Sequence, residues 1–300
     1  MVSLPLRERA ARIAWRGFPQ RTFSGLAGWA GRRRVPRALR PWALARFARW
    51  YGIDVSEAEK PLAEYSGFDD FFTRRLRSGA RPVDPSPAAV ASPADGVIVE
   101  NGALDEGKEV MAKGALFTLD GLLADASAAD RFRGGCYLVT YLSPRDYHRV
   151  HAPLGGAVVG WRHIPGRLFP VGTKSVAREP GLFMRNERFV TFIDGPGGVC
   201  AVVMVAAVGV GHVTAAYDPE VATHDAAFVR AGVSSRVYDV PRPIGKGDEV
   251  GTFHLGSTAI ALFQPGRVQL DPIVPGTPTR MGQTVGRLVS SRADARLEVG

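Results

Sequence analysis

The longest apolar run of this chain is Val199–Gly211 (VCAVVMVAAVGVG), thirteen residues without a charge. A bilayer-spanning helix needs about 20 predominantly apolar residues, so this run is too short to cross a membrane. Its valines are β-branched, and β-branched side chains favour extended backbone. The run therefore predicts a buried strand over residues 199–210, or two strands joined at a bend.

Glycine and proline, 35 and 22 residues of the 300, divide much of the remaining chain into short β-forming segments. This spacing is typical of a strand-dominated sandwich or barrel, and the predicted fold class is α+β. One helix is predicted near residues 67–77, where Phe68, Phe71, Phe72 and Arg75 recur at helical intervals, and another at 116–129. The predicted strands are 97–100, 136–142, 156–162, 189–193, 199–210, 258–263 and 267–270.

The first fifty residues differ in composition from the rest of the chain. They hold twelve arginines, no lysine and one acidic residue, Glu8, so that their net charge is +11 against +9 for the whole chain. Four of the five tryptophans lie there, at positions 15, 29, 42 and 50. Short helices with interleaved arginine and tryptophan are typical of a segment that lies in the headgroup layer of an anionic bilayer. We predict a basic amphipathic helical segment for membrane association over residues 1–65 and a β-rich domain over residues 66–300.

The basic segment has two other interpretations. Arg32–Arg34 would suit the phosphates of a nucleic acid as well as those of a lipid. A secretory signal is not indicated, because no apolar core precedes a small-residue cleavage site, whereas an organellar transit sequence stays open. Lipid is favoured over nucleic acid by the tryptophans and by an apolar stripe: Trp42, Leu44, Ala45, Phe47 and Ala48.

The two cysteines, Cys136 and Cys200, lie in apolar strand-like runs. Their spacing matches neither a metal site nor a disulfide framework. We expect two reduced thiols in the core and no metal site.

Leu255–Thr258 (LGST) places a serine directly after a glycine among β-forming residues. The Ser257 hydroxyl can attack the Gly256 carbonyl, since glycine leaves room for the attack and tolerates strained geometry. The resulting ester could eliminate to release a C-terminus at Gly256, and hydrolysis of the dehydroalanine would turn residue 257 into a pyruvoyl ketone. Taken alone, the four residues are more typical of a bulge or an ordinary turn in a strand.

Two further segments carry side chains that could activate this serine. Tyr141–Pro153 (YLSPRDYHRVHAP) contains His148 and His151, and Ser92–Gly96 (SPADG) contains Asp95. A histidine within hydrogen-bond reach activates a hydroxyl nucleophile, and a carboxylate on its other nitrogen orients it. Taken singly, Asp95 is also a standard turn residue, and the histidines could be half a metal site or surface residues.

Together these segments resemble the phosphatidylserine decarboxylase family, pyruvoyl enzymes that mature by self-cleavage at Leu-Gly-Ser-Thr. The resemblance extends from about residue 50 to about residue 290. The segments that carry it are Phe68–Arg74 (FDDFFTR), Ser92–Gly96, Tyr141–His151, Gly166–Phe169 (GRLF), Leu182–Arg188 (LFMRNER) and Leu255–Thr258.

The resemblance implies a self-cleavage triad in which His151 activates Ser257 and Asp95 orients His151. Cleavage between Gly256 and Ser257 would give a large chain, 1–256, and a small chain, 257–300. His148 would act in decarboxylation, either as the acid that reprotonates the α-carbon, with a pKa near the working pH, or as a group that holds the substrate carboxylate. His254 receives no role.

The implied reaction is decarboxylation of phosphatidylserine to phosphatidylethanolamine and CO2, through an imine with the pyruvoyl group made from Ser257, which serves as the electron sink. The resemblance further implies a β-barrel-sandwich core and a peripheral location on the cytoplasmic face of the cell membrane, where residues 1–50 meet anionic phospholipid and no nucleic acid. It leaves a homodimer open. A pyruvoyl decarboxylase of another amine and a non-cleaving membrane-anchored β-barrel binding module remain alternatives.

Overall fold

The structure is a computed structural model that describes residues 31, 33–104, 110–112, 115–171, 181–207, 212–223, 225–254 and 257–289. Most of the basic segment, and the Leu255–Gly256 pair before the predicted cleavage site, lie outside the described residues. The helices are α3 (Arg40–Tyr51), α4 (Phe68–Phe72), α5 (Leu119–Leu123), α6 (Ala126–Asp130), α8 (Leu182–Arg185) and α9 (Ala226–Ala231), with the 3-10 turns η1 (Val55–Glu57) and η2 (Leu62–Glu64).

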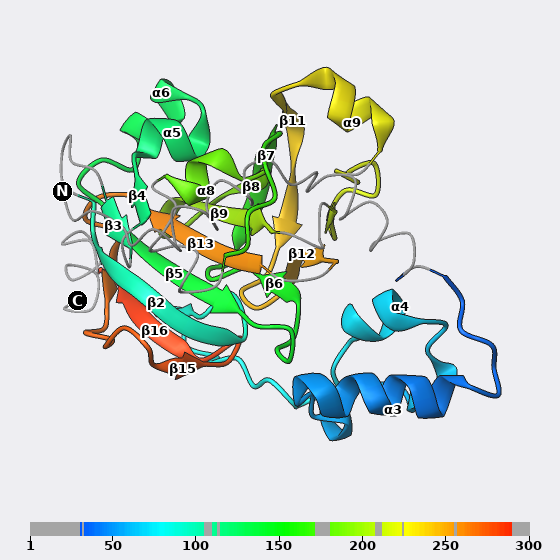
Figure 1. The fold of residues 1–300 in the computed structure, drawn as a ribbon. Coiled ribbons are helices and arrows are strands. Elements are labelled where there is room, and N and C mark those ends of the chain that lie inside the picture. Colours follow the sequence, from blue (N-terminus) through cyan, green and yellow to red (C-terminus); the bar gives the residue numbers. More distant parts are fainter. Residues whose placement is uncertain are drawn as a thin grey trace, which may run out of the picture.

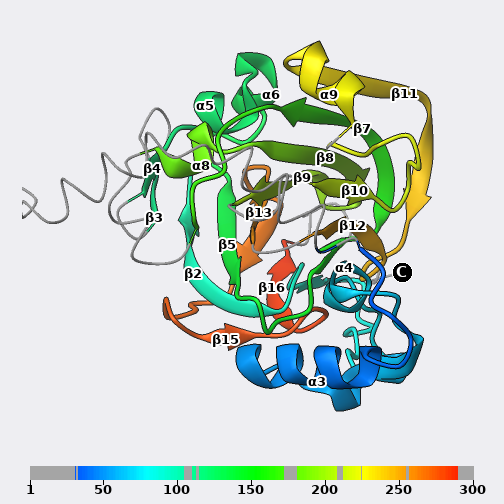
Figure 2. The same cartoon turned by 45° about the vertical axis from the view of Figure 1, so that its right-hand side comes forward.

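An eight-stranded antiparallel sheet forms the centre of the fold, and Figure 2 shows that it is strongly curved. Its strand order is β11-β7-β8-β9-β13-β5-β2-β15. The bounds are β2 (Gly96–Ala103), β5 (Cys136–Leu142), β7 (Gly156–Ile164), β8 (Arg188–Gly195), β9 (Gly198–Ala206), β11 (Ser234–Ile244), β13 (Ser257–Phe263) and β15 (Pro278–Thr279).

Three smaller sheets complete the strands of the described residues. The first has the order β1-β16-β14, the second β10-β12-β6, and the third pairs β3 with β4. Their bounds are β1 (Ala89–Ala91), β3 (Val110–Ala112), β4 (Ala115–Phe117), β6 (Arg149–His151), β10 (Val213–Ala215), β12 (Glu249–Phe253), β14 (Val268–Leu270) and β16 (Thr284–Leu288).

The large sheet has a hydrophobic core on each face. On one face Ala259, Ala261 and Phe263 of β13 pack with residues of the two three-stranded sheets. On the other face Ile260 and Leu262 pack against α5 and α8, which Figure 1 shows beside the sheet. Successive side chains of a strand point to opposite faces, so a strand between two cores is apolar throughout. The predicted strand-dominated α+β sandwich is confirmed.

The strands of the apolar runs agree closely with prediction. β5 has the predicted bounds, and β9 and β13 differ from them by a few residues. β11 was not predicted, although it is the longest strand among the described residues. It contains Pro241 and Pro243 and lies at the edge of the sheet. Proline is tolerated there because an edge strand has a neighbour to pair with on one side only.

Both predicted helices are shorter than expected. α4 ends at Phe72, and the chain beyond it runs back so that Leu76 forms a β-bridge with Ala58. The segment 116–129 contains two short helices, because Ala124 takes the left-handed conformation (φ 51°) that ends α5. Side-chain periodicity alone does not report such caps and turns.

The helix α3 packs against a separate small core. Its Leu44 and Ala48 are buried with Tyr65 and Phe71, and the ring of Phe47 lies 5.3 Å from that of Phe68. Part of the apolar stripe predicted to contact lipid is therefore used for packing inside the protein. The exposed face of α3 instead carries Trp42 and Trp50, which are 67% and 81% exposed.

Candidate active site

Ser257 is the first residue of β13 and is completely buried. It pairs with Leu142 of β5 on one side and with Ala206 of β9 on the other. Its Oγ has no hydrogen-bond partner among the described residues. An unpaired buried hydroxyl costs about 1–3 kcal/mol, which makes such an atom a candidate for a functional role.

The chain that follows β5 turns directly toward the two predicted histidines. The Asp146 carboxylate accepts hydrogen bonds from the backbone N–H and the hydroxyl of Ser143, at 2.7 and 2.6 Å, which closes a turn one residue after Leu142. The buried guanidinium of Arg74 donates to the carbonyls of Arg145 and Asp146 from outside the turn. These hydrogen bonds fix the conformation of the backbone that leads into His148.

His148 is completely buried against the ring of Phe72, with 4.0 Å between ring centroids. Its Nδ1 lies 2.8 Å from the Asp146 carbonyl, so Nδ1 carries the hydrogen and Nε2 holds the lone pair. Burial lowers the pKa of His148 to about 3, with a smaller contribution from the nearby charge of Arg74. The expectation of a pKa near the working pH is therefore wrong for this structure. His148 is neutral, and its Nε2 has no partner among the described residues.

His151 lies on β6 and is also buried. Its Nδ1 is 2.8 Å from the Gly247 carbonyl, and its Nε2 is 3.2 Å from the hydroxyl of Tyr147. Nδ1 therefore carries the hydrogen, and Nε2 accepts from Tyr147. Burial lowers the pKa of His151, although its hydrogen bond to Gly247 opposes the shift. His151 is thus a neutral imidazole with a basic nitrogen directed at a phenol.

Asp95 forms an ion pair with Arg81, which sequence reasoning did not predict. The guanidinium of Arg81 donates to both carboxylate oxygens of Asp95, at 2.6 to 3.0 Å, and also to both oxygens of Glu57, at 2.7 and 3.0 Å. The Met281 N–H donates to Asp95 Oδ1 at 2.8 Å. Burial alone would lower the pKa of Arg81, but the hydrogen bonds to Asp95 and Glu57 outweigh burial and raise it above its usual value.

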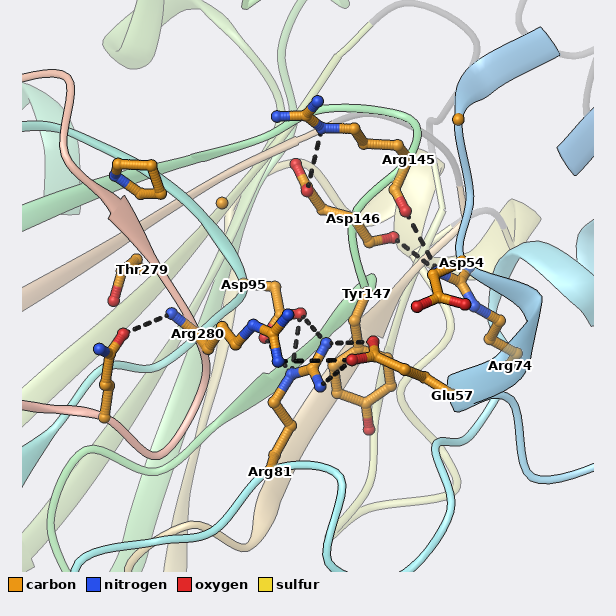
Figure 3. A pocket seen from close by; sticks show the side chains of 14 residues that line it. Asp54, Glu57, Arg74, Arg81, Asp95, Arg145, Asp146, Tyr147, Thr279 and Arg280 are labelled. Carbon is orange, nitrogen blue, oxygen red and sulfur yellow. Dashed lines mark hydrogen bonds and ion pairs between the residues drawn. The ribbon is translucent and has the colours of Figure 1, made fainter. Parts of the chain in front are cut away.

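A cavity of about 460 Å³ adjoins this ion pair. Figure 3 shows acidic and basic side chains intermixed around it, together with Tyr147, which also lines it. Its charged lining residues are Asp54, Glu57, Arg74, Arg81, Asp95, Arg145, Asp146 and Arg280.

The structure brings two members of the predicted triad, His151 and Asp95, into one region, but it does not join the three in one hydrogen-bonded set. The His151 N–H donates to the Pro93 carbonyl at 2.7 Å, which places β6 beside the turn that carries Asp95. The charge of Asp95 raises the pKa of His151 slightly, against the larger effect of burial. Among the described residues no hydrogen bond links Asp95 to His151 or His151 to Ser257. The triad stays a prediction.

Tyr147, which binds His151, and Arg81, which binds Asp95, are the site residues that sequence reasoning missed. Tyr147 lies between Asp146 and His148 in the matched segment, so its position could have drawn notice. Nothing in the sequence distinguishes Arg81 from the other arginines. Cys136 and Cys200 are free thiols, as predicted, and the described residues contain no cluster of three or more potential metal ligands.

A buried serine with an unpaired hydroxyl, in a fold that also buries two neutral histidines, is typical of an enzyme that uses nucleophilic and acid–base chemistry. Comparisons with known proteins agree with this class. A model of the family described as phosphatidylserine decarboxylase matches residues 68–287. A protein of Anaeromyxobacter sp. (strain K), named phosphatidylserine decarboxylase proenzyme, is 44% identical over 282 residues, which cover 94% of this chain and 99% of the relative.

Two further relatives carry the same name. The protein of Myxococcus xanthus (strain DK1622) is 44% identical over 89% of this chain and 94% of its own length. The protein of Bordetella petrii is 43% identical over 88% of this chain and 92% of its own length. The chain belongs to the phosphatidylserine decarboxylase family, and the resemblance seen in its sequence is confirmed.

Proposed function

We propose that this chain is a proenzyme that cleaves itself between Gly256 and Ser257 and then decarboxylates phosphatidylserine. The observation that carries the proposal is the Ser257 hydroxyl, which is buried and unpaired at the first position of β13. The names of the relatives, phosphatidylserine decarboxylase proenzyme, support both the substrate and the need for maturation.

The cleavage balances with water as the only co-reactant. Ser257 Oγ bonds to the Gly256 carbonyl carbon, the peptide C–N bond breaks, and the hydroxyl proton passes to the freed amine. A base then removes the α-proton of residue 257 while the bond between Cβ and the ester oxygen breaks, and Gly256 leaves as a carboxylate. Addition of one water to the remaining dehydroalanine, with loss of one ammonia, leaves a pyruvoyl group at residue 257.

His151 is the base in this proposal. A neutral imidazole with its hydrogen on Nδ1 offers the lone pair of Nε2 to a proton, and the Gly247 carbonyl holds that tautomer. The same lone pair now accepts from Tyr147, so Tyr147 and Ser257 compete for it. The role of Asp95 is to orient this region through the turn that binds the His151 backbone.

Residue 257 fits a pyruvoyl group because the position is buried, carries a small side chain and has no competing partner among the described residues. The pyruvoyl ketone supplies the electron sink for the electrons left when CO2 departs.

His148 contributes its unpaired Nε2 to the second reaction. A substrate carboxylate entering beside it raises the pKa of His148, because a nearby negative charge favours the imidazolium. His148 then holds the proton that the α-carbon receives after CO2 leaves. Phe72 covers the ring and keeps water away from it.

The exposed face of α3 supports contact with a membrane surface. Trp42 and Trp50 are exposed there, together with the arginines at positions 46 and 49. Each basic residue close to an anionic surface contributes about 1 kcal/mol to binding. The described residues include no helix long and apolar enough to cross a membrane. The positive charge supports binding at the anionic cytoplasmic face of the cell membrane, and the exposed tryptophans favour lipid over nucleic acid. Association as a homodimer remains part of the proposal.

The test is the intact mass of the wild-type protein and of Ser257→Ala under denaturing conditions. Cleavage predicts a large chain that ends at Gly256 and a blocked small chain of 44 residues, 257–300. The Ser257→Ala variant stays uncut. A wild-type chain that remains whole in the presence of anionic phospholipid overturns the proposal and leaves a non-cleaving binding module.

Measurements of decarboxylation then distinguish between the possible substrates. Cleaved protein is incubated with phosphatidylserine vesicles and, in parallel, with free serine and other amino acids, and released CO2 is measured. CO2 from the lipid alone supports the proposal. CO2 from a soluble amino acid alone shows a pyruvoyl decarboxylase of another amine.

A further inference from the structure

His254 lies three residues before Ser257 and is bound by an acidic residue from a distant part of the chain. Its Nδ1 is 2.9 Å from Oδ1 and 3.0 Å from Oδ2 of Asp69 on α4. Both side chains are largely buried, with 18% and 19% exposure. Because Nδ1 faces a carboxylate, it carries the hydrogen and donates it.

A second contact holds His254 from another direction. Its ring stacks on that of His212, with 4.1 Å between centroids and 28° between planes. Its backbone N–H also donates to the His212 carbonyl at 3.2 Å. The side chain and the backbone of residue 254 are therefore both fixed before the chain reaches the predicted cleavage site.

The helix α4 contacts both sides of the candidate active site. Asp69 and Phe72 are three residues apart and share one face of the helix. Asp69 binds His254, while Phe72 packs on the ring of His148. The buried Phe71 anchors α4 in its own core, and Arg149 of β6 donates to the Thr73 carbonyl at its end, at 2.8 and 3.0 Å.

The segment that carries the Gly256–Ser257 bond is thus held at both of its ends. On one side the Phe253 N–H donates to the His148 carbonyl at 2.9 Å, and on the other side Ser257 is paired within the large sheet. The bond of Asp69 to His254 adds a restraint inside this short connection. Each restraint lowers the conformational entropy that the chain has to lose before the hydroxyl can attack.

We propose that Asp69 and His254 are positioning residues for self-cleavage, which hold the connection before Ser257 in the conformation from which the hydroxyl attacks Gly256. This inference rests on the proposed function. It adds a residue pair that acts on the cleavage step, because the bond of Asp69 to His254 restrains the connection to Ser257, and cleavage cuts that connection.

The experiment measures the rate constant of self-cleavage in newly made protein, by densitometry of denaturing gels and by intact mass, for Asp69→Ala, His254→Ala and the double variant. Loss of positioning is expected to slow cleavage by about tenfold to a hundredfold. The double variant should be no slower than the slower single variant, because both changes remove one interaction. Decarboxylation by protein that has finished cleaving, per pyruvoyl group formed, should change by less than about threefold.

Two further variants distinguish positioning from other roles. His254→Asn places an amide N–H near the position of Nδ1 but cannot titrate, so it should restore at least half of the wild-type rate. Asp70→Ala is the matched control. It removes the neighbouring carboxylate of α4, which accepts from Ser66 and makes no contact with His254, and it should cleave at the wild-type rate.

The outcomes separate this inference from the proposed function. If the wild-type chain is never cut, the proposed function fails. If the wild-type chain is cut and Asp69→Ala and His254→Ala are cut equally fast, only the positioning inference is overturned. It is also overturned if His254→Asn is as slow as His254→Ala, because the imidazole would then act by proton transfer. It is overturned as well if Asp70→Ala is as slow as Asp69→Ala, because the effect would then come from the stability of α4.

Discussion

Tyr147 donates its hydroxyl hydrogen to Nε2 of His151 across 3.2 Å, so the nitrogen that would accept the Ser257 proton in the proposed cleavage is already occupied. Burial raises the pKa of Tyr147 above its usual value, which keeps the phenol protonated and able to donate. Self-cleavage by way of His151 therefore requires this hydrogen bond to break.

Tyr147→Phe is expected to speed self-cleavage. A neutral hydrogen bond contributes about 0.5–1.5 kcal/mol, so its loss should raise the rate about two- to tenfold. The measurement is the cleavage rate of newly made protein. Tyr137→Phe is the control, since Tyr137 is a buried tyrosine of β5 that packs on Phe117 instead. Slower cleavage in Tyr147→Phe would show that the phenol assists His151 and does not compete with Ser257.

Arg81→Gln is expected to destabilise the protein by about 3 kcal/mol or more, because it leaves the carboxylates of Asp95 and Glu57 without their shared cation. The side chains of Arg81 and Asp95 are only 6% and 8% exposed. Urea unfolding of the uncut Ser257→Ala protein measures the change. Arg133→Gln is a suitable comparison, since Arg133 binds two acidic residues at the surface, and it should destabilise the protein much less, because solvent screens exposed ion pairs. If both substitutions lowered the free energy of unfolding equally, burial of the ion pair would not explain the effect of Arg81→Gln.

Acid is expected to destabilise the protein through His148. Its pKa is lowered to about 3 in the folded state, whereas an unperturbed histidine titrates near pH 6.5. Between these values the unfolded chain binds a proton that the folded protein does not, so stability falls as the pH decreases through this window. The slope from this group alone is about 1.4 kcal/mol per pH unit.

His148→Asn in the Ser257→Ala background checks this slope by chemical unfolding at several pH values between about 7 and 4.5. The amide can still donate to the Asp146 carbonyl but does not titrate. The unfolding free energy of the variant should decline less steeply with acid than that of its parent. His151 also has a lowered pKa, and its slope persists in both proteins. Parallel curves for variant and parent would refute the assignment to His148.

Changing Trp42 and Trp50 to alanine together is expected to weaken binding to anionic vesicles about tenfold or more, through lost apolar contact with the interface. Cosedimentation with vesicles of phosphatidylglycerol and phosphatidylcholine measures this loss. The paired control changes Val237 and Val240 to alanine, because both are exposed apolar residues on the distant edge strand β11. Unchanged vesicle binding of the tryptophan variant would show that the tryptophans of α3 do not contribute to membrane contact.

How closely a strand could be predicted from the sequence depends on whether it lies in the middle or at the edge of the sheet. The strands of the large sheet that are buried on both faces, β9 and β13, were predicted closely, because continuous apolar runs leave few other solutions. The edge strand β11 was missed, because its register and exposure depend on a neighbour that is distant in sequence.

The site, too, could be predicted only in part. The sequence motifs identified Ser257, His148, His151 and Asp95 as candidate catalytic residues. They could not show that Asp95 binds Arg81, that Tyr147 occupies His151 or that Asp69 reaches His254, since each of these contacts depends on the tertiary fold. Nor could they show that burial would lower the pKa of His148 so far.

The position of Ser257 at the start of β13 has a consequence for the cleaved enzyme. Every residue of β13 is paired with β5 on one side and with β9 on the other, and all seven are buried. Cleavage would create a chain terminus in the interior of the molecule, and the shorter product would supply a middle strand to a sheet built by the longer one. Uncut precursor could refold as one polymer, whereas the two products, once separated by denaturant, would have to find each other and reinsert that strand. Maturation would thereby replace a unimolecular folding equilibrium by a bimolecular one, and the enzyme would stay active only while its two chains remain associated.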